Sequence, residues 1–276
     1  MNDKDGSKAA LVPSQPTALS RAGASSLANR GLHDLVEVEG ADYWRKKGDE
    51  FWEHRNYAEA MRWWRLAADK GDAKAIYAVG HLYRCGHGVA QDYAAAIRWY
   101  HKAADKGHAL AMRSLGFLYY GEGVKQDCAE AMHWFRMAAD QGDALAMASI
   151  GWLYARGDGL QRDYIEAMRW YRMAADEGDA RGMYSIGYLY YNGHGVKRNN
   201  AEAMRWYHLA AEKADGMAML GIGRLYHYGH GVAQELGVAA YWYDRAAKQG
   251  YTEAGKTLAK LLEMGVQPHA PEGEDQ

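Results

Sequence analysis

The sequence is poor in cysteine and proline and carries no marked excess of either charge. Its two cysteines, Cys85 and Cys128, give neither a metal-ligand spacing nor a disulfide framework. A formal net charge of −2 argues against a nucleic-acid partner, because nucleic-acid-binding domains usually carry a basic excess. No run of about 18 apolar residues occurs, so we expect no transmembrane helix.

The ends of the chain differ in composition from the middle. Residues 1–38 lack the continuous apolar stretch of a secretory signal and are predicted to form a disordered leader. Residues 266–276 are predicted to form a disordered acidic tail. We therefore expect a cytoplasmic protein, with export by a route that needs no secretory signal as the alternative.

What the sequence does contain in quantity is glycine, tryptophan and tyrosine. It has 32 Gly, 10 Trp and 21 Tyr against 3 Phe and 4 Pro, which suggests one motif copied many times. A tryptophan followed by a second aromatic residue recurs at successive intervals of 36, 35, 36, 36 and 36 residues. The pairs begin at Trp63, Trp99, Trp134, Trp170, Trp206 and Trp242. A pair of alanines follows each of them, four residues after the tryptophan.

Each repeat is predicted to be a helical hairpin. A glycine box, typified by the Gly-Tyr-Leu-Tyr that begins at Gly187, recurs at Gly80, Gly116, Gly151 and Gly223. A Gly-x-Gly turn follows the box, where positive φ angles would end the first helix. The Trp-aromatic pair and the alanine pair then form the second helix. An Asp after the boundary glycine would cap the next first helix.

A single hairpin cannot bury its own apolar stripe, so stability must come from stacking on its neighbours. We predict a leading hairpin at 41–70 and a C-terminal capping helix at 250–265. Between them the sequence predicts five repeats, at 71–106, 107–141, 142–177, 178–213 and 214–249. The fold class predicted is all-α, a solenoid of stacked hairpins with disordered ends.

One stretch matches the phosphate-binding loop of nucleotide-binding enzymes letter for letter. Gly250 to Thr257 reads G-x-x-x-x-G-K-T, but that loop needs a buried strand before its first glycine. Residues 241–249 have the spacing of a helix instead. We interpret the match as a repeat boundary followed by the capping helix, and predict no nucleotide site. No hydrolase, zinc-protease or Rossmann fingerprint occurs, so we predict no catalytic residues, no metal and no cofactor.

Units such as GDARGMYSIGYLYYNGHGVKRNNAEAMRWYHLAAEK resemble the Sel-one-like repeat, a relative of the tetratricopeptide repeat. The resemblance covers roughly residues 41–265. The leading hairpin has a shorter turn and looks more like a tetratricopeptide repeat. The resemblance implies a right-handed α-solenoid that acts as an adaptor or scaffold. Some bacterial members carry a Cys pair in every repeat and have been linked to β-lactam binding or hydrolysis. The single cysteines here do not match that branch.

In such solenoids the first helix of each hairpin lines a concave groove. Offsets of −3, +1 and +4 from the box glycine fall on one helical stripe. This stripe is rich in aromatic residues and arginine, the types enriched at binding hot spots, and we interpret it as surplus to folding. The same offsets also give the small or apolar residues Ala148, Ala155 and Leu220. The predicted partner-binding residues are Trp52, Tyr77, His81, Arg84, Arg113, Phe117, Tyr120, Trp152, Arg156, Arg181, Tyr184, Tyr188, Tyr191, Arg224 and His227.

The sequence therefore predicts a non-enzymatic scaffold for a protein or peptide segment that carries acidic groups and apolar anchors. A role in bacterial regulation or signalling is the leading hypothesis. A translocated effector is an alternative, and a β-lactam hydrolase or NTPase is a weaker one. At individual positions such as Tyr120 and Tyr191, packing between repeats competes with binding as the explanation. His87, His194 and His230 are interpreted as solvated turn residues, and no base is identified beside Cys85.

Overall fold

The computed structural model describes residues 40–271, and the predicted disordered leader and the last five residues of the predicted tail lie outside this range. Within it the chain forms thirteen helices and no strands, which confirms the all-α prediction. None of these helices is long and apolar enough to span a membrane. The helices are α2 (Ala41–Glu53), α3 (Tyr57–Asp69), α4 (Ala73–Cys85), α5 (Tyr93–Ala104), α6 (Ala109–Tyr120), α7 (Cys128–Ala139), α8 (Ala144–Arg156), α9 (Tyr164–Asp176), α10 (Ala180–Asn192), α11 (Asn200–Glu212), α12 (Gly216–Tyr228), α13 (Leu236–Lys248) and α14 (Thr252–Glu263).

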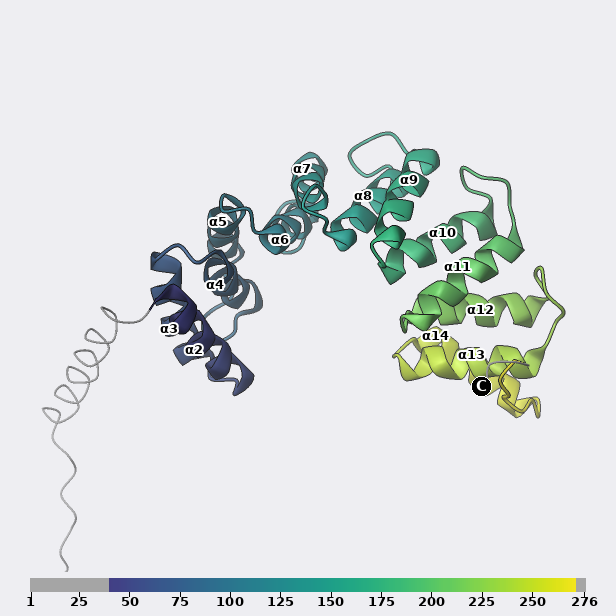
Figure 1. The fold of residues 1–276 in the computed structure, drawn as a ribbon. Coiled ribbons are helices and arrows are strands. Elements are labelled where there is room, and N and C mark those ends of the chain that lie inside the picture. The colour runs from purple at the N-terminus through teal and green to yellow at the C-terminus, as the bar shows by residue number, and fades with distance from the viewer. Residues whose placement is uncertain (1–39, 272–276) are drawn as a thin grey trace, which may run out of the picture. The chain divides into compact units, whose positions relative to one another are not determined.

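The chain divides into two compact units between Asp72 and Ala73. In the first unit, α2 and α3 pack against each other as a hairpin and bury Trp44 and Trp64. In the second unit, five hairpins follow in order, and α14 packs against α13. Each second helix also contacts the first helix of the next hairpin, so the hairpins of this unit stack in chain order (Figure 1).

Short polar side chains determine where the helices begin. Asp143, Asp179 and Asp215 each accept a hydrogen bond at 2.8 Å from the backbone amide three residues later, which caps α8, α10 and α12. The second helices α5, α7, α9 and α11 are capped in the same way, as by Asp163 at the start of α9, whereas Glu235 makes no side-chain cap at the start of α13. Left-handed glycines end the first helices, with φ of 77° at Gly157. The predicted aspartate caps are therefore confirmed at these three helices.

The two helices of a hairpin meet where the box glycine faces an aromatic ring. A Cβ atom added at Gly151 would lie 2.7 Å from Cδ1 and Cε1 of Tyr171 and 3.1 Å from the carbonyl oxygen of Ala167. The corresponding rings are almost completely buried in all five hairpins, at 0–3% exposure. The glycine is thus needed because its missing side chain is the space that the ring occupies. The glycine and ring pairs are Gly80–Tyr100, Gly116–Phe135, Gly151–Tyr171, Gly187–Tyr207 and Gly223–Tyr243.

The segment that matches the phosphate-binding loop, residues 250–257, begins at the junction of two helices. Helix α13 runs to Lys248, Gly250 has a φ of 91°, and α14 begins at Thr252. The prediction of a helix in front of Gly250 is confirmed. Lys256 and Thr257 lie inside α14, and the Thr257 hydroxyl donates to the Glu253 carbonyl at 3.0 Å.

Replacing Gly151 by alanine tests this packing. We expect Gly151→Ala to lower the free energy of unfolding by about 1–3 kcal/mol, because the new methyl group collides with Tyr171 and with backbone. Gly255→Ala on α14 is the matched control, since its Cβ would meet only the Ala247 Cβ at an ordinary 3.7 Å. That control should be neutral or more stable, because alanine favours a helix interior over glycine. Urea denaturation of both variants measures the difference, and midpoints that shift alike would contradict the packing argument.

Candidate partner-binding groove

The predicted groove residues divide between the two units. Trp52 lies on α2 of the first unit, where its ring is 5.1 Å from that of Tyr57 and 5.7 Å from that of Trp64. All the others lie on the first helices of the five hairpins of the second unit, α4, α6, α8, α10 and α12.

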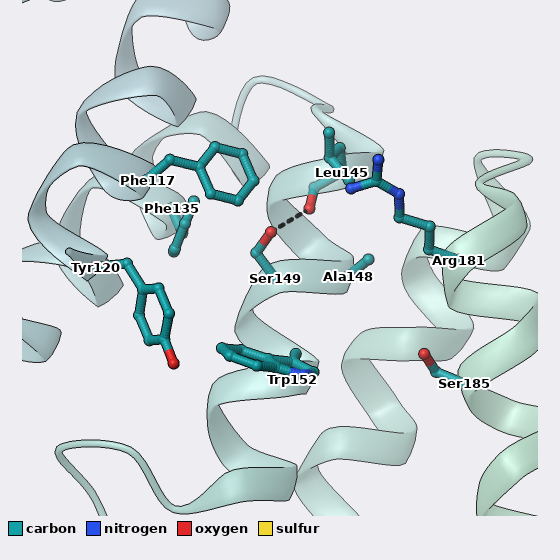
Figure 2. A pocket seen from close by; sticks show the side chains of 9 residues that line it. All are labelled: Phe117, Tyr120, Phe135, Leu145, Ala148, Ser149, Trp152, Arg181 and Ser185. Carbon is teal, nitrogen blue, oxygen red and sulfur yellow. Dashed lines mark hydrogen bonds between the residues drawn. The ribbon is translucent and has the colours of Figure 1, made fainter. Parts of the chain in front are cut away.

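Three cavities open along α6, α8, α10 and α12. The first cavity has a volume of about 280 Å³ and is lined by Phe117, Tyr120, Phe135, Leu145, Ala148, Ser149, Trp152, Arg181 and Ser185 (Figure 2). The second, of about 370 Å³, lies between α8, α9 and α10 and is lined by Trp152, Ala155, Arg156, Tyr164, Tyr171, Tyr184, Ser185, Tyr188, Leu189 and His194. The third, of about 130 Å³, is lined by Tyr184, Tyr188, Tyr191, Asn192, Tyr207, Met217, Leu220, Gly221 and Arg224. Because Trp152 lines the first two cavities and Tyr184 and Tyr188 line the last two, the three cavities adjoin one another along these helices, and we refer to them together as the groove.

The first two cavities exist because α8 carries small residues at two places in the stripe. At offset −3 from the box glycine the other hairpins have Tyr, Arg, Tyr and Leu, whereas α8 has Ala148. At offset +4 they have Arg, Tyr, Tyr and His, whereas α8 has Ala155. Ala148 lines the first cavity and Ala155 the second, so each replacement leaves space on one side of Trp152.

Trp152 is held in place although 38% of it is exposed. The Tyr120 ring contacts it edge-on, with ring centroids 5.0 Å apart, and the Arg156 guanidinium lies 4.6 Å from its ring centroid. The Asp158 carboxylate fixes both neighbours, accepting from the Tyr120 hydroxyl at 2.6 Å and pairing with Arg156 Nε at 2.9 Å. Burial, the hydrogen bond and the charge of Asp158 together raise the pKa of Tyr120 to about 12. Tyr120 therefore stays protonated and donating at neutral pH.

Asp158 is the residue that sequence reasoning missed. It is the middle residue of the Gly-x-Gly turn in its hairpin. In two other hairpins, the residue at this turn position also contacts the preceding hairpin. Arg84 pairs with Glu122 at 2.5 Å, and the Tyr191 hydroxyl lies 3.1 Å from His230 Nδ1. The partners in these three contacts are 38 or 39 residues apart. Comparing residues at that separation across the repeats could therefore have identified the contact between Tyr120 and Asp158.

Arginines on the groove helices are mostly engaged by carboxylates. Besides Arg84 and Arg156, Arg113 pairs with Asp143 at 2.8 Å and Arg224 with Glu253 at 2.5 Å. Arg181 is different, because it is exposed and forms no hydrogen bond or ion pair with any residue in the range 40–271. In Figure 2 its side chain extends from α10 toward α8 at the rim of the first cavity.

The three predicted groove tyrosines of α10, Tyr184, Tyr188 and Tyr191, differ in how accessible they are to a ligand. Tyr184 stacks on the core ring of Tyr207, with centroids 5.7 Å apart, and burial raises its pKa to about 12. Tyr191 is tied to His230. Tyr188 is 45% exposed and lies where the second and third cavities meet.

Other stripe residues hold the stack together. Tyr77 stacks on His108 of the next hairpin at 4.9 Å, Phe117 packs edge-on against Phe135 at 5.1 Å, and the Tyr243 hydroxyl lies 3.4 Å from His227 Nδ1. Leu220 is only 3% exposed. The expectation that the whole stripe is surplus to folding is therefore wrong, because several of its members fill the joints between helices.

Two expectations about histidine also need correction. His194 stacks on Tyr164, with ring centroids 4.6 Å apart, and His230 contacts Tyr191, so neither is simply solvated in its turn. His81 Nε2 lies 3.6 Å from the Cys85 sulfur, one helical turn away, which supplies the neighbouring base that the sequence did not identify. No cluster of three or more His, Cys, Asp or Glu side chains in the described range could hold a metal ion.

Comparison with known proteins identifies the repeat. A family model described as "Sel1 repeat" matches residues 41–72, 73–108, 109–143, 144–179, 180–215 and 214–251. The match includes 41–72, the segment whose shorter turn looks like that of a tetratricopeptide hairpin. A search of curated protein sequences finds no significant match.

Among solved structures, the chain is similar to a Sel1 repeat protein from Oxalobacter formigenes, with 35% identity and a TM-score of 0.74 over 81% of this chain and 93% of that one. It is also similar to a protective antigen of uropathogenic Escherichia coli strains with an SLR fold, with 36% identity and a TM-score of 0.73 over 88% of this chain. This chain covers 53%, or about half, of the length of the Escherichia coli protein.

A pair of arginine variants separates structural from exposed positions in the groove. Arg113→Ala leaves Asp143, whose side chain is only 6% exposed, without its ion-pair partner, so we expect a loss of about 1–3 kcal/mol in the free energy of unfolding. Arg181→Ala removes no internal contact and should change it by less than about 0.5 kcal/mol. Urea denaturation of the two variants provides the test, and equal losses would contradict the assignment.

The partly buried His81 predicts a pH dependence of stability. Burial and the positive charges of Arg84 and His87 lower the pKa of His81, against the opposing effect of Glu122. The unfolded chain then binds a proton more readily, with a pKa of about 6.5, so the stability from neutral His81 is complete above that pH and is lost as the pH falls below it. Between pH 7 and pH 5, the melting temperature of the wild type should fall further than that of His81→Gln. His133→Gln on the exposed side of α7 should keep the wild-type slope, and equal slopes for all three proteins would contradict the effect.

Proposed function

Because the chain belongs to the Sel1 repeat family, we propose that it is a protein-interaction scaffold that holds a segment of a partner protein in the groove along α6, α8, α10 and α12. Sel1 repeats form helical scaffolds that commonly serve as protein-interaction modules. The observation that carries the proposal is the continuous run of three cavities whose shared walls are Trp152, Tyr184 and Tyr188.

The shape of the groove favours a chain over a compact ligand. The cavities measure about 130–370 Å³ each, at or below the lower end of the roughly 300–1,000 Å³ typical of small-molecule pockets. Small pockets in a row suit the spaced side chains of an extended or helical segment. The exposed Trp152 and Tyr188 are large, rigid side chains of the kind that dominates binding energy at protein interfaces.

The site also favours binding over chemistry. Apart from Arg181, its charged groups are committed to holding neighbours, as Asp158 holds Tyr120 and Arg156. The rings of Tyr171 and Tyr207, whose pKa values burial raises, lie at the base of the groove and stay protonated. We infer an adaptor role in a bacterial regulatory or signalling complex, since both similar structures above are bacterial. A cytoplasmic location stays a prediction of the sequence.

Affinity capture from a bacterial lysate, followed by mass spectrometry, tests the proposal. Trp152→Ala and Tyr188→Ala should each lose the partner that the wild type retains, because both remove exposed contact area from the groove. Their melting temperatures should stay close to the wild-type value, since neither residue belongs to the buried core of the hairpins.

Ile165→Ala is the matched control, because Ile165 is 61% exposed on the second helix α9 and lines none of the three cavities. It should keep the partner. A partner retained by both aromatic variants, or lost equally from the Ile165 variant, would count against the groove.

A further inference from the structure

We propose that the bound segment carries a carboxylate that pairs with Arg181 and apolar side chains that occupy the first and second cavities on either side of Trp152. This inference rests on the proposed function and adds the chemistry of the partner. It would identify the ligand as an acidic peptide with two apolar anchors.

The charge of the groove selects the ligand. Among residues 40–271, no aspartate or glutamate lines any of the three cavities, whereas Arg181, Arg156 and Arg224 each line one. Arg156 and Arg224 already have carboxylate partners in Asp158 and Glu253. Arg181 is therefore the cation that a ligand can engage without breaking an existing ion pair.

The surroundings of Arg181 leave its guanidinium available. The partly buried Asp215, which caps α12, feels its positive charge but forms no ion pair with it in the described structure. The first cavity beside it is lined mainly by Phe117, Phe135, Leu145 and Trp152. A guanidinium at the rim of an apolar cavity offers a carboxylate two parallel hydrogen bonds in a site with reduced water access, where they are stronger than on an open surface.

Trp152 provides the apolar surface against which the ligand would pack. Because Tyr120 and Arg156 both contact the indole, little side-chain freedom is lost when a ligand packs against it. Ala148 lines the first cavity and Ala155 the second, and Trp152 is a wall of both. A segment crossing Trp152 can therefore place one apolar side chain in each cavity while its acidic residue faces Arg181.

Panning a phage-displayed library of random 12-residue peptides on the full-length protein tests the proposal directly. The wild type should enrich peptides that combine two apolar residues with a nearby Asp or Glu. Arg181→Gln should still enrich the apolar pair but lose the acidic preference, while Arg181→Lys should retain it in part. For one selected synthetic peptide, Arg181→Gln should weaken binding by at least about tenfold, because a charge-assisted hydrogen bond is lost.

Changing the acid of that peptide to its amide should weaken binding to the wild type by a similar factor and have little further effect on Arg181→Gln. Arg98→Gln on the second helix α5 makes the same change in net charge away from the cavities and should bind as the wild type does. Enrichment of apolar peptides without an acidic preference, or equal preferences in wild type and Arg181→Gln, would overturn the inference while leaving the proposed function intact. If no peptide is enriched, or if Trp152→Ala enriches the same peptides, both the inference and the proposed groove fail.

Discussion

The whole stack depends on a missing side chain in each first helix. The box glycine lets the aromatic ring of the second helix pack against the first helix backbone, and the rings so placed are 0–3% exposed in the second unit. This contact determines how closely the two helices approach and which face of the first helix points into the hairpin. The stripe at offsets −3, +1 and +4 lies beside this contact, and its residues are shared among packing on the same rings, contacts with the next hairpin and the groove.

What each stripe position does is decided by its partner in the next hairpin. Arg84, Arg113 and Tyr120 all reach side chains 30 to 38 residues ahead and tie successive hairpins together. Where α8 has alanines in place of such long side chains, the tie is absent and two cavities flank Trp152. The two larger of the three cavities therefore lie where the bonding between stripe residues is interrupted, and Asp158 holds Tyr120 and Arg156, the two residues that contact Trp152 there.

The fold was largely predictable because the features that determine it recur in every repeat. Helix spacing, the aspartate caps at α8, α10 and α12, and the helix in front of Gly250 follow from local residue types that the repeats present many times. For the candidate groove, the sequence predicts which helical stripe is involved but not which of its residues are accessible to a ligand. Whether Arg113 or Arg181 is available depends on a partner in another hairpin, and Ala148 and Ala155 define cavities by the side chains that they lack, which no motif of reactive residues reveals.

This division between scaffold and stripe explains how a repeat protein can acquire a particular ligand. Substitutions at Ala148, Ala155 or Arg181 leave the glycine–ring contacts and the caps untouched, so the stack can keep its fold while the cavities change. A rigid stack also presents Trp152 and Tyr188 at fixed positions, which lowers the entropy lost on binding compared with a groove built from loops. In the proposed complex, specificity would come from cavity shape and from the Arg181 guanidinium, which has no ion-pair partner among residues 40–271, because burying that charge without a carboxylate is unfavourable and discriminates against neutral segments of the same apolar pattern.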